Sequence, residues 1–349
     1  MKPEIIEKLV RTSVKEITPY RSARDEFEDF EAQIIFLDAN ENPFNSGANR
    51  YPDPLQRKLK RALANVKQVK SEQILLGNGS DEVLDLIFRT FCEPGEEEAL
   101  ILPPTYGMYK VLAKLNNINV KEVPLDENFE IDIDLVFKAI NSKTKIIFIC
   151  SPNNPSGNII PIDKIKQLLD GFNGVVVVDE AYIDFSEEKS ALSILNQYPQ
   201  LLVCQTFSKA YGLAGIRLGM CFANPSIINY FNKIKPPYNV NSLTQRKALE
   251  KLEDSGEIND QVNKLIAERK KLNQELKQFD FITKIYPSDA NFLLVVVDDA
   301  IKRYNQFLKA GIVLRDRSSL KGCKNTLRIT IGTPEENVNF IKVCKSIDL

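Results

Sequence analysis

Residues 206–219 read TFSKAYGLAGIRLG, and this stretch is the most informative part of the sequence. It places Lys209 in a turn rich in hydroxyl groups and glycine, directly after an apolar segment, with Arg217 eight positions later. A lysine amine with a lowered pKa can form an imine with a carbonyl compound. Thr206, Ser208 and Arg217 could together bind a phosphate group, with the guanidinium donating as a two-pronged fork. An isolated Ser-Lys pair is more often a surface turn, but the complete stretch favours a ligand that carries both groups.

A second informative stretch precedes this turn. Residues 175–182 read VVVVDEAY, a run of four valines that ends in Asp179. Such an unbroken run is typical of a strand buried on both faces, and a carboxylate at its end is destabilising unless it meets a positive charge. A protonated pyridine nitrogen would supply that charge, and Tyr182 could then donate to an oxygen on the same ring. Asp179 could equally cap the helix that follows.

Three further polar turns follow apolar segments and could face the same ligand. The Ser-Pro-Asn-Asn-Pro turn contains Asn154, which could bind a ring oxygen or simply belong to an Asn-Pro turn. The Gly-Asn-Gly-Ser turn ends at Ser80, which could present backbone N–H groups to a phosphate or be a plain N-cap. The Pro-Pro-Thr-Tyr-Gly turn contains Tyr106, whose ring could stack on a planar ligand or pack in the core.

Two arginines near the C-terminal end lie in or beside apolar segments. Arg315 belongs to the segment LRDR and Arg328 to the segment LRITIG. Arginine in such a setting indicates recognition of a carboxylate or a phosphate, because its planar fork matches both anions. A buried structural ion pair is the alternative for each.

Composition limits the chemistry that this chain can carry out. The 349 residues include 46 basic and 47 acidic side chains, so the near-neutral net charge gives no attraction to nucleic acid or anionic membranes. The absence of histidine excludes every mechanism with a histidine base, triad or metal ligand, and no metal site is expected. The six cysteines form no Cys-x-x-Cys pair and are expected to be buried free thiols. The first ten residues contain acidic side chains where a signal peptide would be apolar, so a cytoplasmic protein is expected.

Strand and helix patterns alternate along the first two thirds of the chain. Short β-branched segments separated by helical ones predict an α/β fold with a mostly parallel sheet covered on both faces. The length favours two domains, which we expect to be a large domain at residues 33–236 and a smaller α+β domain at 237–349. Residues 1–32 read as an N-terminal arm, and the polar turns are expected at the carboxyl edge of the sheet.

These motifs, in this order, resemble the fold-type I aminotransferases that depend on pyridoxal phosphate. The resemblance extends from about Leu37 to Asn337. More narrowly, five segments are similar to those of the histidinol-phosphate aminotransferases: LDANENP at 37–43, RYP at 50–52, PPTYGMY at 103–109, SKAYGLAGIRLG at 208–219 and LRITIGT at 327–333. The family's fold implies a large domain with a seven-stranded type of sheet and a small domain that both chain ends form, so the arm would join the small domain.

The resemblance also implies roles for individual residues. Lys209 would form the imine with the cofactor and move the proton, and Asp179 would pair with the pyridine nitrogen. Tyr182 and Asn154 would bind the ring oxygen, and Tyr106 would stack on the ring. The remaining cofactor contacts would come from Gly79, Ser80, Asp81, Thr206, Ser208 and Arg217, and from Tyr51, which would reach the neighbour's cofactor phosphate in a homodimer. The substrate would be bound by Tyr20, Asn40, Arg315 and Arg328.

The implied reaction is a reversible transamination in histidine biosynthesis. Histidinol phosphate and 2-oxoglutarate would give imidazole-acetol phosphate and glutamate. An aminotransferase for aromatic amino acids, or a pyridoxal-phosphate decarboxylase for a phosphorylated amino acid, would share the cofactor residues and differ only in the substrate pocket. A non-catalytic regulator of the same fold is a further alternative, but it would carry a DNA-binding helix-turn-helix and a basic patch, and the sequence has neither.

Overall fold

The computed structural model describes residues 4–20, 22, 24 and 35–348. Its helices are α1 (Glu4–Leu9), α2 (Thr12–Glu16), α3 (Arg57–Lys67), α4 (Ser80–Phe91), α5 (Met108–Leu115), α6 (Ile133–Ala139), α7 (Ile162–Gly171), α8 (Pro225–Ile234), α9 (Ser242–Glu253), α10 (Ser255–Leu276), α11 (Ala300–Lys309) and α12 (Pro334–Ile347). Its strands are β1 (Ile74–Asn78), β2 (Glu98–Ile101), β3 (Asn119–Glu122), β4 (Thr144–Cys150), β5 (Val175–Asp179), β6 (Leu201–Thr206), β7 (Leu218–Phe222), β8 (Ile282–Ile285), β9 (Phe292–Val297), β10 (Arg315–Asp316) and β11 (Thr326–Thr330).

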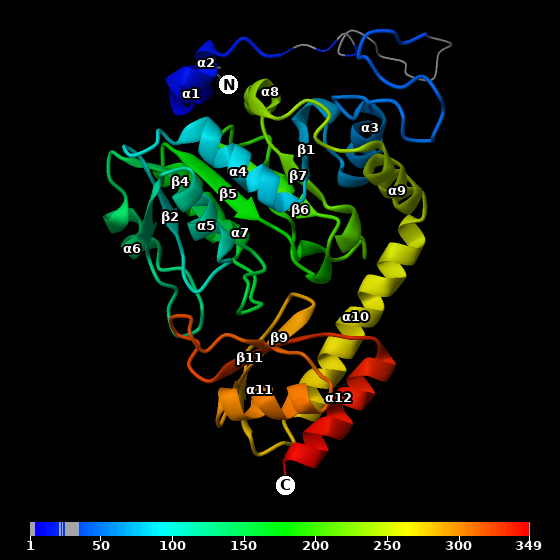
Figure 1. Cartoon of the computed structure of the whole chain (residues 1–349). Helices are drawn as coiled ribbons and strands as arrows, with labels where there is room; N and C mark the ends of the chain where they lie inside the picture. Colours follow the sequence, from blue (N-terminus) through cyan, green and yellow to red (C-terminus); the bar gives the residue numbers. More distant parts are fainter. Residues whose placement is uncertain (1–3, 21, 23, 25–34, 349) are drawn as a thin grey trace.

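The larger sheet has seven strands in the order β1-β7-β6-β5-β4-β2-β3. Strand β7 runs antiparallel to both neighbours, and the other neighbouring pairs are parallel. Helices lie on both sides of this sheet (Figure 1). The α/β fold with a mostly parallel sheet that the sequence predicts is therefore confirmed.

Alternation along the central strands explains why the sheet carries two helical layers. In β5, Val175 and Val177 face one apolar cluster, together with residues of α4, α5 and α8. Val176 and Val178 face the opposite cluster, which includes residues of α6 and α7. Because successive side chains of a strand point to opposite faces, an unbroken valine run satisfies both layers at once.

The carboxyl ends of the central strands meet at one edge of this sheet. Cys150, the last residue of β4, pairs with Asp179, the last residue of β5. Asp179 in turn pairs with Cys204 of β6, which ends two residues later at Thr206, and the turn that contains Lys209 follows. Parallel register thus gathers the polar turns that follow these strands, as expected for an open α/β sheet.

The N-terminal helices α1 and α2 pack on the large domain. Ile6, Leu9 and Val14 are buried in the same apolar cluster as α4 and α8, and Arg11 Nε donates to Glu93 Oε2 at 3.2 Å. Residues 4–16 therefore lie on the large domain and not on the small domain, where the resemblance placed the arm. Figure 1 shows these helices at the opposite end of the molecule from the C-terminus.

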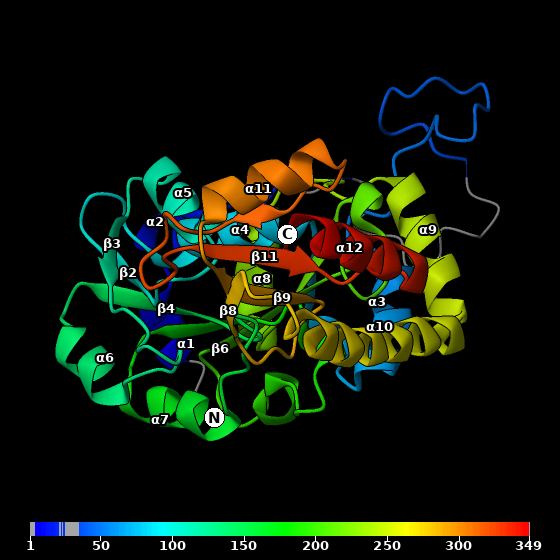
Figure 2. The same cartoon turned by 90° about the horizontal axis from the view of Figure 1, so that it is seen from below.

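The second core is built on a four-stranded antiparallel sheet in the order β10-β11-β9-β8. Helices α11 and α12 and the end of α10 pack with this sheet in one apolar cluster (Figure 2). Leu272 and Leu276 of α10 belong to this second core, whereas Ile258 and Val262 of the same helix belong to the large-domain core. The two cores therefore meet along α10, which lies within the range 237–349 that the sequence predicts for the smaller domain.

Helix α10 is long, with 22 residues, but charged side chains recur along it. Within the described part of the chain, no helix is both long enough and apolar enough to cross a membrane.

Gly219, near the start of β7, offers a test of how tightly the carboxyl edge of the large sheet packs. A Cβ at this position would lie 2.2 Å from the backbone nitrogen of Ser80, a contact that only backbone movement could relieve. We expect Gly219→Ala to destabilise the protein by about 1–3 kcal/mol through overpacking. Thermal unfolding measures the effect, and Gly215→Ala is the control because nothing lies within 4 Å of its added Cβ. Equal melting temperatures for the two variants would contradict the packing seen here.

Candidate active site

A cavity of about 170 Å³ lies at the carboxyl edge of the large sheet. The side chains that line it come from the turns after β1, β4, β5 and β6, and from the segment after β2. The predicted site residues among them are Ser80, Asp81, Tyr106, Asn154, Asp179, Tyr182, Thr206, Ser208, Lys209 and Arg217. Cys150, Ala181 and Ala214 complete the lining and were not predicted. The fold thus brings one group of predicted residues into a single cavity.

Asp179 is the buried carboxylate of this cavity, with a side chain 3% exposed. Its Oδ2 accepts a hydrogen bond from the Tyr109 hydroxyl at 2.7 Å, and its Oδ1 accepts one from the Ala181 backbone N–H at 3.2 Å. Burial raises the pKa of Asp179 to about 6, although both hydrogen bonds and the charge of Lys209 oppose this shift. Tyr109 was not predicted as a site residue, because a tyrosine on the apolar face of a helix is usually a core residue.

Lys209 is half-buried and lines the cavity, with its amine over the ring of Tyr182. Its Nζ lies 5.4 Å from the centroid of the Tyr182 ring. Burial lowers the pKa of Lys209, and the positive charge of Arg328 lowers it further, whereas Asp179 opposes the shift. A lowered pKa increases the fraction of neutral amine, which is the form that attacks a carbonyl carbon or accepts a proton.

One end of the cavity is suited to a phosphate group. Ser80 begins α4, so the first N–H groups of this helix face the cavity with the positive end of the helix dipole. Arg217 approaches the same end, and its Nη2 lies 3.8 Å from Asp81 Oδ2. Gly79 permits this approach, because a Cβ there would lie 2.6 Å from Arg217 Nη2. The Thr206 hydroxyl stabilises the turn, accepting from the Ser208 backbone N–H and donating to the Leu218 carbonyl.

Tyr106 and Asn154 are fixed by neighbours on other elements. The Tyr106 hydroxyl donates to Asp81 Oδ1 at 3.0 Å. Asn154 Oδ1 accepts from Arg328 Nη1 at 2.6 Å, which leaves the Asn154 amide nitrogen as a donor toward a ligand. The Arg328–Asn154 hydrogen bond also links the small sheet to the cavity of the large domain.

Arginines from β10, β11 and the segment after β10 gather beside this link. Arg315 is exposed and pairs directly with Arg328 across the two strands. Arg317 is half-buried, and its Nε is buried without a hydrogen-bond partner. Burial and the charges of Arg328 and Arg315 lower the pKa of Arg317 to about 10. Arg315 was predicted from the sequence and Arg317 was not, although positions two apart in an extended segment share a face.

Tyr51 and Asn40 lie outside this cavity. Both line a separate surface hollow of about 560 Å³. Tyr51 stacks on Tyr238 with ring centroids 4.6 Å apart, and Tyr20 is 75% exposed. The structure therefore places Tyr20, Asn40 and Tyr51 away from the cavity of their own chain.

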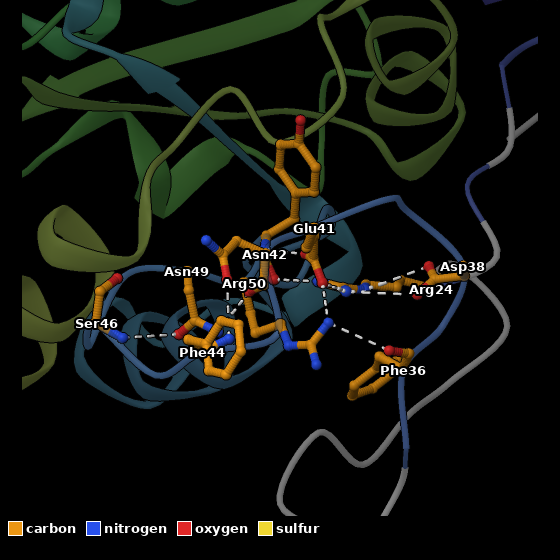
Figure 3. A network of polar contacts seen from close by, with 10 residues as sticks. Arg24, Phe36, Asp38, Glu41, Asn42, Phe44, Ser46, Asn49 and Arg50 are labelled. Atoms are coloured by element: carbon orange, nitrogen blue, oxygen red, sulfur yellow. Dashed lines mark hydrogen bonds and ion pairs between the residues drawn. The ribbon is translucent and has the colours of Figure 1, made fainter.

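A polar network around Glu41 fixes the loop that carries Tyr51 (Figure 3). Glu41 Oε2 accepts from Arg24 Nη2 at 2.6 Å and from Arg50 Nη1 at 2.8 Å, and Glu41 Oε1 accepts from the Tyr51 backbone N–H. These hydrogen bonds outweigh burial and lower the pKa of Glu41 to about 2. The position of Tyr51 is thus set by charge-assisted hydrogen bonds.

The raised pKa of Asp179 predicts a pH dependence of stability for the protein without a bound ligand. This pKa is about 6 in the folded chain, against an ordinary value of 3.8. Between these values the folded chain binds more protons than the unfolded chain, so the free energy of unfolding falls as pH rises, by up to about 3 kcal/mol. Above about pH 6 this group should cause no further loss.

Asp179→Asn tests this expectation, because the amide does not titrate. The melting temperature of the ligand-free variant, relative to that of the ligand-free parent protein, should increase as pH is raised from about 4 to about 6. A difference that stays constant with pH would show that Asp179 titrates at its ordinary pKa.

Comparison with known proteins places the chain in a family. Residues 32–343 match the family described as aminotransferase class I and II. A protein from Flavobacterium psychrophilum named histidinol-phosphate aminotransferase is 56% identical over 342 residues, which cover 98% of this chain and 99% of that protein.

Solved structures agree with this placement. The histidinol-phosphate aminotransferase from Clostridium acetobutylicum is 27% identical, with a TM-score of 0.80 over 86% of this chain and 91% of that chain. The enzyme of the same name from Sinorhizobium meliloti, solved in complex with pyridoxal-5'-phosphate, shares the fold at 22% identity and a TM-score of 0.77, over 85% of this chain and 83% of that chain. The chain therefore belongs to the class I and II aminotransferases and, among them, to the histidinol-phosphate aminotransferases.

Proposed function

We propose that the protein transfers an amino group between histidinol phosphate and 2-oxoglutarate, giving imidazole-acetol phosphate and glutamate, with pyridoxal phosphate as cofactor. The observation that carries this proposal is a single cavity lined by Lys209, the buried carboxylate of Asp179 and the N-terminus of α4. These are the groups that an aldehyde, a pyridinium nitrogen and a phosphate require.

The described residues fit this cofactor. Asp179 is buried and forms no ion pair with any described residue, so a ligand that brings a positive charge would compensate it. Tyr106 would stack on the ring, and Tyr182 and the Asn154 amide would donate to the ring oxygen. Ser80, Ser208 and Arg217 would bind the phosphate, with Gly79, Asp81 and Thr206 shaping that end of the cavity. When bound, the cofactor supplies an aldehyde that captures the substrate nitrogen and a ring that accepts electrons from the α-carbon.

Lys209 and Asp179 would perform the proton chemistry. The Lys209 amine, with its lowered pKa, would remove the proton from the substrate α-carbon and return a proton to the adjacent cofactor carbon. Asp179 would keep a proton on the ring nitrogen throughout, and Tyr182 would keep its own proton because burial raises its pKa to about 12. The low exposure of these groups would limit competing reactions with water.

The arginines of the small sheet would bind the anion that both substrates carry. Histidinol phosphate ends in a phosphate and 2-oxoglutarate in a carboxylate, and a guanidinium can donate two hydrogen bonds to either. Arg315, Arg317 and Arg328 form no ion pair with a described carboxylate, so their charges are available to a ligand. Burial lowers the pKa of Arg328, and the nearby charge of Arg315 adds to this shift.

A homodimer would complete the site. The hollow that contains Tyr51 and Asn40 is also lined by Leu243, which is 61% exposed, and the segment that carries Asn40 exposes Leu37 at 88% and Phe44 at 81%. Such exposure is unfavourable unless another surface covers it. A second copy seated there would receive Tyr51 near its cofactor phosphate, and a role for Tyr20 or Asn40 in substrate binding would likewise require that second copy.

Amine transfer by the purified protein tests the proposed function directly. With 2-oxoglutarate as acceptor, histidinol phosphate should yield glutamate at least about tenfold faster than phenylalanine, since only the former offers a phosphate to the arginines. Lys209→Ala should abolish this turnover and the visible absorption of the lysine-bound cofactor, whereas Lys247→Ala, an exposed lysine of α9, should change neither. Release of carbon dioxide from a phosphorylated amino acid, or a preference for phenylalanine, would refute the assignment.

Arg317 and Arg315 offer a second test, of the substrate pocket. Arg317→Gln should raise the KM for histidinol phosphate about tenfold or more, because loss of a hydrogen bond to a charged group costs about 1.5–3 kcal/mol. Arg315→Gln should have a smaller effect, because Arg315 is exposed and solvent screens its charge. Cofactor affinity should be unchanged in both variants, and an equal loss of cofactor and substrate affinity would contradict the role given to Arg317.

A further inference from the structure

Tyr109 of α5 lies behind the carboxylate of the active site. Its side chain is fully buried, and its hydroxyl donates to Asp179 Oδ2 at 2.7 Å. The ring stacks on Phe148 of β4 with centroids 4.9 Å apart and planes 18° apart. The Tyr109 ring also makes a T-shaped contact with the ring of Tyr106, which lines the cavity. Their centroids lie 5.6 Å apart and their planes are at 86°. Tyr109 is therefore held on two sides while its hydroxyl contacts Asp179.

The hydrogen bond from Tyr109 orients the carboxylate of Asp179. One carboxylate oxygen accepts from Tyr109 and the other from the Ala181 backbone N–H, so rotation of the carboxylate would break both contacts. A carboxylate has about four lone-pair sites, which leaves acceptor capacity for a donor in the cavity. Asp179 can thus bind a donor on the ligand without losing either protein partner.

The same hydrogen bond influences where a proton resides. Asp179 and a pyridine nitrogen can share one proton as a carboxylate with a pyridinium or as a carboxylic acid with a neutral pyridine. Both forms contain the same number of protons, so their relative stability decides which of them is populated. A donor to the carboxylate stabilises its ionised form and therefore favours the pyridinium.

Other ionisable groups near Asp179 act in different directions. The charge of Lys209 also favours the ionised form of Asp179, whereas the charge of Asp81 disfavours that form. Cys150 lines the cavity, but burial and the charge of Asp179 raise the pKa of its thiol well above the neutral range, so it stays protonated. Among the described side chains, Tyr109 is the one that donates a hydrogen bond to this carboxylate.

We propose that Tyr109 is a positioning residue that holds Asp179 oriented and ionised opposite the ring nitrogen of bound pyridoxal phosphate. This inference rests on the proposed function, because it concerns the proton on that nitrogen. A purely structural tyrosine would contribute to packing through its ring. A positioning tyrosine also acts through its hydroxyl, and only the second role predicts a change in the titration of the cofactor.

Tyr109→Phe in the cofactor-loaded enzyme separates these roles, because it removes the hydroxyl and retains the ring. With less positive charge on the ring, the nitrogen that joins Lys209 to the cofactor should become more basic. The pH midpoint of the visible absorption change should therefore move upward. We expect kcat to fall about tenfold with KM changed less than about twofold, since the hydrogen bond acts on the chemical step.

Tyr230→Phe is the matched control, because Tyr230 packs against the same apolar cluster as Tyr109 and forms no contact with Asp179. It should leave the midpoint and kcat unchanged. Asp179→Asn removes the group through which Tyr109 acts, so adding Tyr109→Phe to Asp179→Asn should produce no further shift in the midpoint. A shift of the same size in both backgrounds would overturn the inference.

Two further outcomes are decisive. If Tyr109→Phe folds, binds the cofactor and titrates like the parent enzyme, Tyr109 is only a packing residue and the proposed function stands. If the parent enzyme binds no cofactor, the proposed function itself fails. Should the phenylalanine variant fail to fold, 3-fluorotyrosine at position 109 keeps the ring and strengthens the donor, and it should move the midpoint downward. An unchanged midpoint there would likewise overturn the inference.

Discussion

The buried charge of Asp179 is the constraint on which the site depends. A carboxylate with 3% exposure is strongly destabilising unless donors or a cation compensate it. Its neighbour Glu180 is equally buried, and Ser190, the Ala191 backbone N–H and Gln205 all donate to it. Burial still raises the pKa of Glu180 to about 7, although these three hydrogen bonds oppose the shift. Asp179 has two donors and, unlike Glu180, lines the cavity, so a ligand can reach it.

The strand pattern of the large sheet and most of the cavity could be predicted from the sequence, because each rests on local chemistry. The valine run of β5 is buried on both faces, and the turns after β4, β5 and β6 meet because the strands are parallel. Strands β3 and β8 could not be predicted from the sequence, since their side chains are mostly exposed or half-buried and show no apolar alternation. From Leu243 to Phe279, charged residues alternate with apolar ones at helical spacing, which predicts a helical region but not where it is interrupted. Asp254 separates α9 from α10 there and caps α10 by accepting from the Glu257 N–H.

Long-range contacts explain what the sequence could not predict. Residues 4–16 could pack on either core, and only the fold shows Val14 buried against the helices of the large domain. Tyr109 looks like a core residue until its hydroxyl is seen to face Asp179, seventy positions away along the chain. Arg317 lies two positions after Arg315 in the sequence, and only the tertiary structure shows that Arg317 is the more buried of the two.

The division of the site between two cores has a chemical consequence. The groups assigned to the cofactor come from the large domain, whereas Arg315, Arg317 and Arg328 come from the small sheet. One hydrogen bond, from Arg328 to Asn154, joins the two sets, and Asn154 is also the donor assigned to the ring oxygen. A substrate anion that draws Arg328 toward itself would therefore alter a contact of the cofactor ring. Recognition of the distant phosphate and the electronic state of the ring would then be coupled through a single amide, so that binding energy from the non-reacting end of the substrate could contribute to the chemical step.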